Sequence, residues 1–361
     1  MVKEYAKLLV EYAIYLQKGE KVFVNTTTLA EPLLVELHKE IIKAGAHPDY
    51  FIAFPGQELH LLEFGSDEQL QHVSPVRKFA MEQYDAYIGI AAPFEGYSTK
   101  DISSEKKTLL KQSQNEIFDI YFRRLGVDLK RTSCLWPTKS NAQLAGMTLA
   151  EYEHFVFNAM ALYDREPKQY WKELSAFQQR IVDYLNGKDT IQYIGPNCDI
   201  TFRCKDRIWQ NSDGKNNMPS GEVFTSPIED SVNGWIHFSL PGYYMGQEVE
   251  NVRLEVKDGY VTSWEASKGK DFLDEIFAID GARIFGEVAI GTNSRIQQIT
   301  KNILFDEKIG GTVHMAIGQS YLNCGGKNKS SVHWDMITDM KTGGKIIVDG
   351  VKIYEDGEFT I

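Results

Sequence analysis

Apolar residues recur at helical spacing near the start of the chain. Leu8, Tyr12 and Leu16 follow one another at intervals of one helical turn, so their side chains fall on one face of a helix. This pattern predicts a helix over residues 5–17, and Gly19 follows it as a stop signal.

The first half of the chain alternates between strand and helix patterns. Residues 86–92 are almost continuously apolar, which is typical of a strand covered by helices on both faces. The alternation predicts an α/β layer with a mostly parallel sheet. The predicted strands cover residues 21–25, 48–54, 86–92 and 131–136, and the further predicted helices cover residues 31–43, 67–83 and 104–125.

The pattern changes after Gly187. Residues 139–187 are predicted to be mostly helical, and Thr148 with Glu151 has the form of a capping box. Beyond Gly187, short strand-like segments with glycine turns predict a β-rich α+β region. We therefore expect an N-terminal α/β domain over residues 1–187 and a C-terminal domain over residues 188–361. The predicted C-terminal strands cover residues 190–194, 199–204, 223–224, 236–240, 249–256 and 260–265, with one helix over 271–279.

The charge of the chain limits its partners. The 361 residues carry a formal net charge of −11, and the sequence pI is about 5.3. Phosphate backbones and anionic membranes need a dense basic face, so this balance argues against nucleic-acid and membrane partners. An acidic protein suits cationic partners instead, such as metal ions or the free amine of a peptide.

The cysteines and the N-terminal segment bear on the compartment. The four cysteines form no CxxC pair and are expected to be reduced thiols. The start of the chain lacks a basic segment followed by an apolar one, and the sequence has no run of about 18 apolar residues. We therefore expect a cytoplasmic protein.

Several common catalytic signatures do not occur in the sequence. It contains no GxxxxGK[ST] loop, no GxGxxG turn after a strand, no GxSxG and no HExxH. These absences argue against nucleotide hydrolysis, dinucleotide chemistry, serine hydrolysis and zincin chemistry.

His333 and Asp335 are the most informative pair of candidate ligands. On a strand, residues two apart face the same side, so both would enter one site while Trp334 points away. Mixed histidine and carboxylate ligands suit Zn²⁺, Co²⁺ or Mn²⁺ better than Ca²⁺. A chance pairing is the competing interpretation, because short motifs recur without function.

Glu222 and Glu287 share a local context. Each follows a glycine and precedes a valine, which places a carboxylate at the start of an apolar, strand-like run. A carboxylate directed into a core has to be paired or bound to metal, because burying it bare costs several kcal/mol. The alternative for each residue is a solvent-facing position at a strand end.

Taken together, the acidic and histidine candidates suggest a metal centre in the C-terminal domain. Gathered in space, they could hold two divalent ions about 3.5–4 Å apart, with one carboxylate bridging the pair. The candidates are Glu222, Glu287, the adjacent Asp306 and Glu307, His314, His333 and Asp335.

Four motifs in this half resemble those of the aminopeptidase T family, which comprises bacterial dinuclear metallo-aminopeptidases. A segment of the N-terminal half, residues 141–153, also resembles the family, so the resemblance covers essentially the whole chain. The four motifs are residues 217–227 with Glu222, residues 286–293 with Glu287, residues 314–321 with His314 and Tyr321, and residues 333–335.

The resemblance implies two divalent ions, Zn, Co or Mn, and a role for each matched residue. Glu222 would ligate one ion and Glu287 would bridge both. Tyr321 would be the catalytic tyrosine, donating a hydrogen bond to the oxygen that becomes negative in the tetrahedral intermediate. Glu287 is also a candidate general base. The remaining implied ligands are Glu307, His314, His333 and Asp335.

The expected activity is hydrolysis of the N-terminal residue of peptides that have a free N-terminus, by an enzyme that the resemblance implies to be a homodimer. Two alternatives stay open. Another metal-dependent amidohydrolase or dipeptidase would use the same ligand types. A non-catalytic peptide-binding or metal-dependent scaffold protein that kept the fold would retain some acidic ligands and lack a complete set or the tyrosine. The alternative for Tyr321 itself is a core tyrosine with a satisfied hydroxyl.

Overall fold

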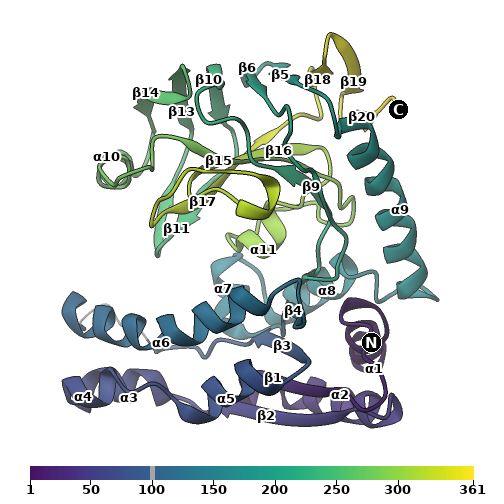
Figure 1. The fold of residues 1–361 in the computed structure, drawn as a ribbon, viewed down its shortest axis with the longest axis vertical. Helices are drawn as coiled ribbons and strands as arrows, with labels where there is room; N and C mark the ends of the chain where they lie inside the picture. Colours follow the sequence, from purple (N-terminus) through teal and green to yellow (C-terminus); the bar gives the residue numbers. More distant parts are fainter. Residues whose placement is uncertain (98–101) are drawn as a thin grey trace. The chain divides into compact units, whose positions relative to one another are not determined.

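The computed structural model describes residues 1–97 and 102–361, and the chain forms two compact units (Figure 1). The first unit comprises Met1–Lys168 with Gly214–Met218, and the second comprises Gln169–Asp213 with Pro219–Ile361. The chain thus leaves the first unit at Lys168, ahead of the boundary expected between residues 187 and 188. The physical reason is helix α9 (Pro167–Leu185), whose apolar residues Ile181 and Leu185 belong to the core of the second unit.

A five-stranded sheet of order β2-β1-β3-β4-β8 forms the centre of the first unit, and all its pairings are parallel. The predicted α/β layer is therefore confirmed. Helices α5 and α6 pack on the sheet through a cluster that includes Phe23, Met81 and Ile117. The strands are β1 (Lys21–Thr27), β2 (His47–Ala53), β3 (Ala86–Ala91), β4 (Lys130–Leu135) and β8 (Asn217–Met218). The helices are α1 (Val2–Leu8), α2 (Glu31–Lys43), α3 (Gln57–Phe64), α4 (Asp67–Leu70), α5 (Pro75–Gln83), α6 (Ser104–Arg124), α7 (Lys139–Leu144) and α8 (Leu149–Ala159).

Two predicted helices of this unit differ from the structure. The prediction of a single helix over residues 67–83 was wrong, because two separate helices, α4 and α5, occupy this segment. Pro75 begins α5, and the hydroxyl of Ser74 accepts a hydrogen bond from the Arg77 N–H as its cap. Proline has no N–H to donate and suits only a first turn, so it starts a helix there. At the N-terminus, α1 passes into a π-helical turn over Leu9–Ala13, and the helix ends before the predicted residue 17.

The capping box predicted at α8 is present. The Thr148 hydroxyl accepts from the backbone N–H of Glu151 at 3.3 Å, and the Glu151 carboxylate accepts from the Thr148 N–H at 2.8 Å.

Two antiparallel sheets build the second unit. The larger has the order β14-β13-β10-β6-β5-β18-β19-β20, the smaller has the order β17-β16-β15-β9-β7, and β11 with β12 forms a separate ribbon. The predicted β-rich α+β character of this half is confirmed. The strands are β5 (Thr190–Gly195), β6 (Cys198–Arg203), β7 (Gln210–Ser212), β9 (Glu222–Thr225), β10 (Asn233–Phe238), β11 (Gly242–Tyr244), β12 (Gln247–Val249), β13 (Val252–Lys257), β14 (Tyr260–Glu265), β15 (Phe285–Gly291), β16 (Thr312–Gly318), β17 (His333–Asp339), β18 (Lys345–Val348), β19 (Val351–Glu355) and β20 (Glu358–Phe359). The other helices are α10 (Lys270–Phe277) and α11 (Ile303–Asp306).

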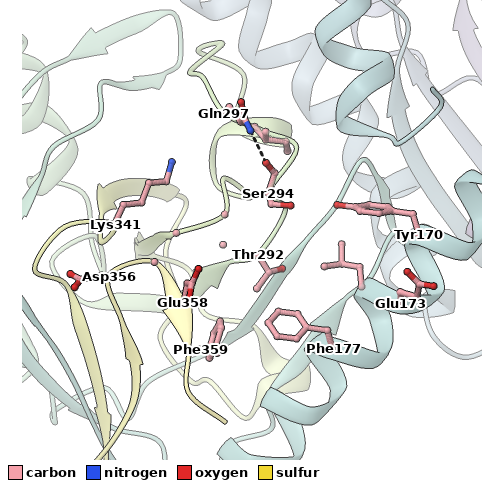
Figure 2. A pocket seen from close by; sticks show the side chains of 16 residues that line it. Tyr170, Glu173, Phe177, Thr292, Ser294, Gln297, Lys341, Asp356, Glu358 and Phe359 are labelled. Carbon is pink, nitrogen blue, oxygen red and sulfur yellow. Dashed lines mark hydrogen bonds between the residues drawn. The ribbon is translucent and has the colours of Figure 1, made fainter. Parts of the chain in front are cut away.

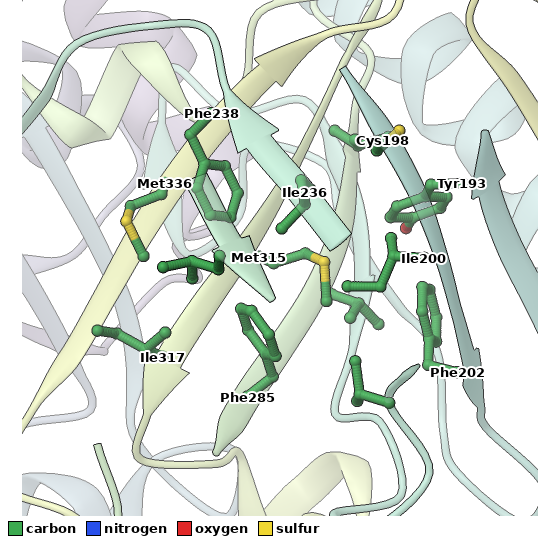
Figure 3. Close-up of a cluster of buried hydrophobic side chains, with 14 of the residues drawn as sticks. Tyr193, Cys198, Ile200, Phe202, Ile236, Phe238, Phe285, Met315, Ile317 and Met336 are labelled. Carbon is green, nitrogen blue, oxygen red and sulfur yellow. The ribbon is translucent and has the colours of Figure 1, made fainter. Parts of the chain in front are cut away.

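A hydrophobic core joins the two sheets of the second unit (Figure 3). Phe238 on β10 and Phe202 on β6 come from the larger sheet, while Phe285 on β15, Met315 on β16 and Met336 on β17 come from the smaller one. Because side chains alternate along a strand, the smaller sheet keeps its second face free of this core.

Two expectations about the whole chain can be compared with the described residues. All four cysteines are buried free thiols. Over residues 1–97 and 102–361, no helix combines the length and the apolar character needed to cross a bilayer.

Candidate metal centre

Three neighbouring strands carry candidate ligands on the face of the smaller sheet that points away from the core. In the antiparallel register, Glu287 on β15 lies opposite Ala316 on β16, and Ala316 lies opposite Asp335 on β17. The small alanine between the two acidic residues leaves room above the sheet for both carboxylates.

Strand alternation separates the ligands from the core on β16 and β17. Trp334 and Met315 belong to the hydrophobic core. Their neighbours His333, Asp335 and His314 therefore project to the opposite face. His333 and Asp335 lie on a strand, as their expected common face requires, and this strand, β17, starts at His333.

A β-bulge on β15 directs Glu287 to the same face. The register between β15 and β16 shifts between Phe285 and Glu287. Phe285 packs in the core. In a regular strand Glu287, two positions later, would face the core as well, and the extra residue of the bulge turns it to the opposite face. Gly286 lies at the bulge, where an added Cβ would come within 2.2 Å of the carbonyl oxygen of Gln319. Only glycine fits this close approach.

Glu222 and Glu307 reach the cluster from other elements. Glu222 begins β9, opposite Gly291 of β15, and its carbonyl oxygen accepts a hydrogen bond of 3.1 Å from the side chain of Gln178 on α9. Glu307 follows α11 directly. The neighbouring Asp306, also a candidate in the sequence, instead accepts hydrogen bonds of 2.8 Å from the N–H and the hydroxyl of Thr300.

The six predicted ligands gather in the second unit. Nε2 of His314 lies 3.3 Å from Oε2 of Glu222 and 3.8 Å from Oε1 of Glu287. Nε2 of His333 lies 3.1 Å from Oε2 of Glu287 and 3.7 Å from Oδ2 of Asp335. Two groups each place their ligand atoms within 4.8 Å of one another, and these are Glu222 with Glu307 and His314, and Glu287 with His314 and Asp335.

A backbone carbonyl orients the ring of His333. Its Nδ1 lies 2.8 Å from the carbonyl oxygen of Gln319. A carbonyl oxygen only accepts, so Nδ1 carries the hydrogen and directs Nε2 toward the carboxylates. Histidines that bind metals are usually held in this way by a partner on the second ring nitrogen.

Burial and mutual attraction set the charges of the cluster. Burial raises the pKa of Glu222, but Lys308 and His314 outweigh it and bring the pKa to about 2. Burial raises the pKa of Glu307 to about 8. Burial lowers the pKa of His333, but Asp335 and Glu287 outweigh it and bring the pKa to about 10. The crowded carboxylates thus favour the cationic forms of His314 and His333, as expected at a site that attracts cations.

The donor atoms fit divalent metal ions. Among the residues that the structure describes, four buried ligand atoms make no hydrogen bond of acceptable geometry, although two of them lie 3.3 Å apart. These atoms are Oε2 of Glu222, Oδ1 of Asp335, and Nδ1 and Nε2 of His314. Buried polar atoms without partners are costly, and a metal ion would satisfy those that face it. Carboxylate oxygens with imidazole nitrogens are ligands that suit Zn²⁺, Co²⁺ and Mn²⁺.

Tyr321 lies at the solvent side of the cluster. Its hydroxyl oxygen is 3.4 Å from Nε2 of His333, and 37% of the residue is exposed. The negative charge of Glu287, followed by burial, raises the pKa of Tyr321 well above its usual value. The hydroxyl therefore keeps its proton and can act as a hydrogen-bond donor.

Sequence reasoning missed Lys308. Its side chain is fully buried, and its ammonium group contacts Oε1 of Glu222 at 3.0 Å and Oε1 of Glu307. The available signal was its position, directly after a candidate ligand and before the glycine pair at residues 310–311.

A separate cavity of about 1000 Å³ opens elsewhere in the second unit (Figure 2). Tyr170 and Phe177 of α9 line one side, and Lys341 and Glu358 line another. The predicted ligands are absent from its described lining, so the cavity is distinct from the candidate centre.

Comparison with known proteins defines the class. Residues 1–359 match the model of a family described as thermophilic metalloprotease (M29), and the protein is accordingly a metal-dependent peptidase. The chain belongs to this M29 family. The resemblance inferred from the four motifs is thereby confirmed.

Relatives and a solved structure agree with this assignment. The chain is 28% identical to aminopeptidase 2 of Geobacillus stearothermophilus, over 96% of this chain and 93% of the relative. It is 26% identical to aminopeptidase AmpS of Bacillus subtilis, over 88% of this chain and 83% of the relative. The structure of wild-type AmpT from Thermus thermophilus has the same fold, with a TM-score of 0.86 and 20% identity over 100% of this chain and 99% of that one.

Proposed function

We propose that the protein is an aminopeptidase that removes the N-terminal residue of peptides with the help of two divalent metal ions. The observation that carries the proposal is the set of buried ligand atoms of Glu222, Asp335 and His314 that make no hydrogen bond of acceptable geometry in the described part of the chain. The names of the relatives, which are aminopeptidases, support the substrate class.

The proposed ligands divide between the two groups of donor atoms. Glu222, Glu307 and His314 would hold one ion, and Glu287 and Asp335 would hold the other. His333, which contacts both of these carboxylates, would join the second ion, and Glu287 would be the ligand shared by both. Bound there, Zn²⁺, Co²⁺ or Mn²⁺ ions supply a water of lowered pKa and polarise the scissile carbonyl.

Residues of the chain would perform the remaining steps. Tyr321 donates a hydrogen bond to the oxygen that becomes negative in the tetrahedral intermediate. Glu287 is the candidate general base, and the Gln319 carbonyl keeps His333 oriented. The resemblance further supports a homodimer and a site carried by the C-terminal domain. The sequence features described above support a cytoplasmic location.

Metal removal tests the proposal. Chelator-treated protein should lose hydrolysis of leucyl-p-nitroanilide and regain it with Zn²⁺, Co²⁺ or Mn²⁺ added singly. The N-acetylated substrate should remain uncleaved, because it lacks the free amine. Cleavage of the acetylated substrate would favour another amidohydrolase, and peptide binding without cleavage in the metal-loaded protein would favour the non-catalytic alternative.

A further inference from the structure

Lys308 places a positive charge inside the candidate metal centre. Its side chain has no exposed surface, and both of its ion pairs go to one ligand group, with Nζ 3.0 Å from Oε1 of Glu222 and in contact with Oε1 of Glu307. The proposed chemistry gives this ammonium group no role. Lysine side chains are seldom fully buried unless they are paired, so the position of Lys308 calls for an explanation.

The backbone holds Lys308 in place. Its N–H donates to the carbonyl oxygen of Phe305 at 3.0 Å, and its own carbonyl oxygen accepts from the N–H of Asn293 at 3.0 Å. An enclosed side chain on a pinned backbone has little freedom to swing away from the carboxylates.

The ammonium and a metal ion would compete for the same oxygens. Glu222 and Glu307 are two of the three members of one group of ligand atoms, and the third member, His314, also belongs to the group of Glu287 and Asp335. A divalent ion bound there has to share these carboxylates with Lys308, and two like charges repel strongly in a buried site. Neither described ion pair of Lys308 involves Glu287 or Asp335, whose carboxylates lie near His314 and His333 instead.

We propose that Lys308 makes the two metal positions unequal. The group containing Glu287 and Asp335 binds one ion tightly, and the group containing Glu222 and Glu307 binds the second ion weakly, in competition with the Lys308 ammonium. The inference rests on the two-metal function proposed above. It makes the occupancy of the second position, and with it the activity, depend on the free metal concentration.

Calorimetric titration of the chelator-treated full-length protein with Co²⁺ tests the inference. The wild type should bind one ion per chain at least about 100-fold more tightly than the second. Lys308→Met removes the charge and keeps an unbranched side chain, so the second ion should bind at least about 10-fold more tightly than in the wild type. Lys308→Arg keeps the charge and should retain the weak second position.

Lys345→Met is the matched control. Lys345 on β18 makes a surface ion pair with Glu355 at 3.3 Å, and losing it should leave both affinities unchanged. Two equally tight ions in the wild type would overturn the inference, as would a Lys308→Met protein whose second ion binds no better. If the wild type binds no ion, the candidate metal centre and the proposed two-metal function are both contradicted.

A measurement on the wild type alone covers the case in which Lys308→Met does not fold. A buried ammonium exchanges its protons slowly enough to be followed by ¹⁵N NMR of labelled lysine. The Lys308 signal should persist through the first equivalent of Zn²⁺ and change with the second. A signal that changes fully with the first equivalent would contradict the inference.

Discussion

Nε2 of His333 lies 3.1 Å from Oε2 of Glu287, although strand β16 separates the strands that carry the two residues. The contact spans the sheet above Ala316, the small residue that lies between Glu287 and Asp335 in the register. It fixes Glu287 at the point where the two groups of candidate ligands meet.

Glu287→Gln should therefore damage metal binding and activity together. The amide keeps the shape of the side chain but removes the negative charge that a bridging ligand needs. We expect hydrolysis of leucyl-p-nitroanilide to fall by about 100-fold or more, with loss of bound metal and an unchanged circular dichroism spectrum. Glu265→Gln, at an exposed position of β14, is the control. A Glu287→Gln protein with full activity would end the assignment of this residue.

Tyr321→Phe should separate catalysis from metal binding. The hydroxyl is proposed to stabilise the developing oxyanion, and loss of one such donor costs about 10²–10³ in turnover. Metal content should stay at the wild-type level, because the phenol is not among the proposed ligands. Steady-state kinetics with metal analysis measures both quantities, and Tyr260→Phe on β14 is the control. Unchanged kcat in the Tyr321→Phe protein would exclude this role.

Shortening a large side chain in the core between the two sheets should lower the stability of the protein. The Phe202 ring is fully buried, and its centroid lies 5.0 Å from that of Tyr193 in an edge-to-face arrangement. Phe202→Ala should destabilise the protein by about 3–5 kcal/mol, because it removes apolar contacts and leaves a cavity. Urea denaturation measures the loss. Val351→Ala, at a position that is 52% exposed, should change stability by less than about 0.5 kcal/mol. Equal effects of the two changes would contradict the described core.

Glu248 should contribute stability that depends on pH. Its carboxylate lies 2.6 Å from Nζ of Lys268 and 2.7 Å from Nζ of Lys301, and hydrogen bonds from Lys268 and then Lys301 lower its pKa. A pKa lower in the folded state gives stability that is present above the unfolded value of about 4.5 and is lost as the pH falls through the folded value. The exposed Lys268 limits the contribution to about 1 kcal/mol or less.

Urea unfolding of wild type and Glu248→Gln at a series of pH values measures this contribution. The wild type should be the more stable protein at pH 7, and the difference should narrow below about pH 4.5. A difference that stays constant or widens on acidification would contradict the ion pair.

Local patterns predicted the elements that depend on neighbouring residues. The common face of His333 and Asp335 followed from the period of two of a strand, and the α8 cap followed from Thr148 and Glu151. The single helix over residues 67–83 failed because Pro75, a residue that starts helices, was passed over within an apolar pattern. The N-terminal helix ended early because the chain leaves the helical conformation after the π-helical turn, where Tyr15 has a φ of 43°.

The arrangement of the candidate centre depends on long-range pairing. The family resemblance indicated which residues to consider, but not that Ala316 lies between Glu287 and Asp335. The bulge at Gly286 and the contacts of Lys308 depend on strands and turns that are distant in sequence. The pattern of residues within a short segment does not determine how that segment pairs with a strand that is distant in sequence.

The alternation on β17 restricts how this part of the gene can change. Trp334 enters the core while its two neighbours face the candidate centre, so inserting or deleting one residue within the strand would exchange the two faces. The indole would then enter the polar cluster and a carboxylate would enter the hydrophobic interior. Insertions and deletions in the connection between β16 and β17 would leave this alternation intact, whereas the strand itself can evolve only by substitution.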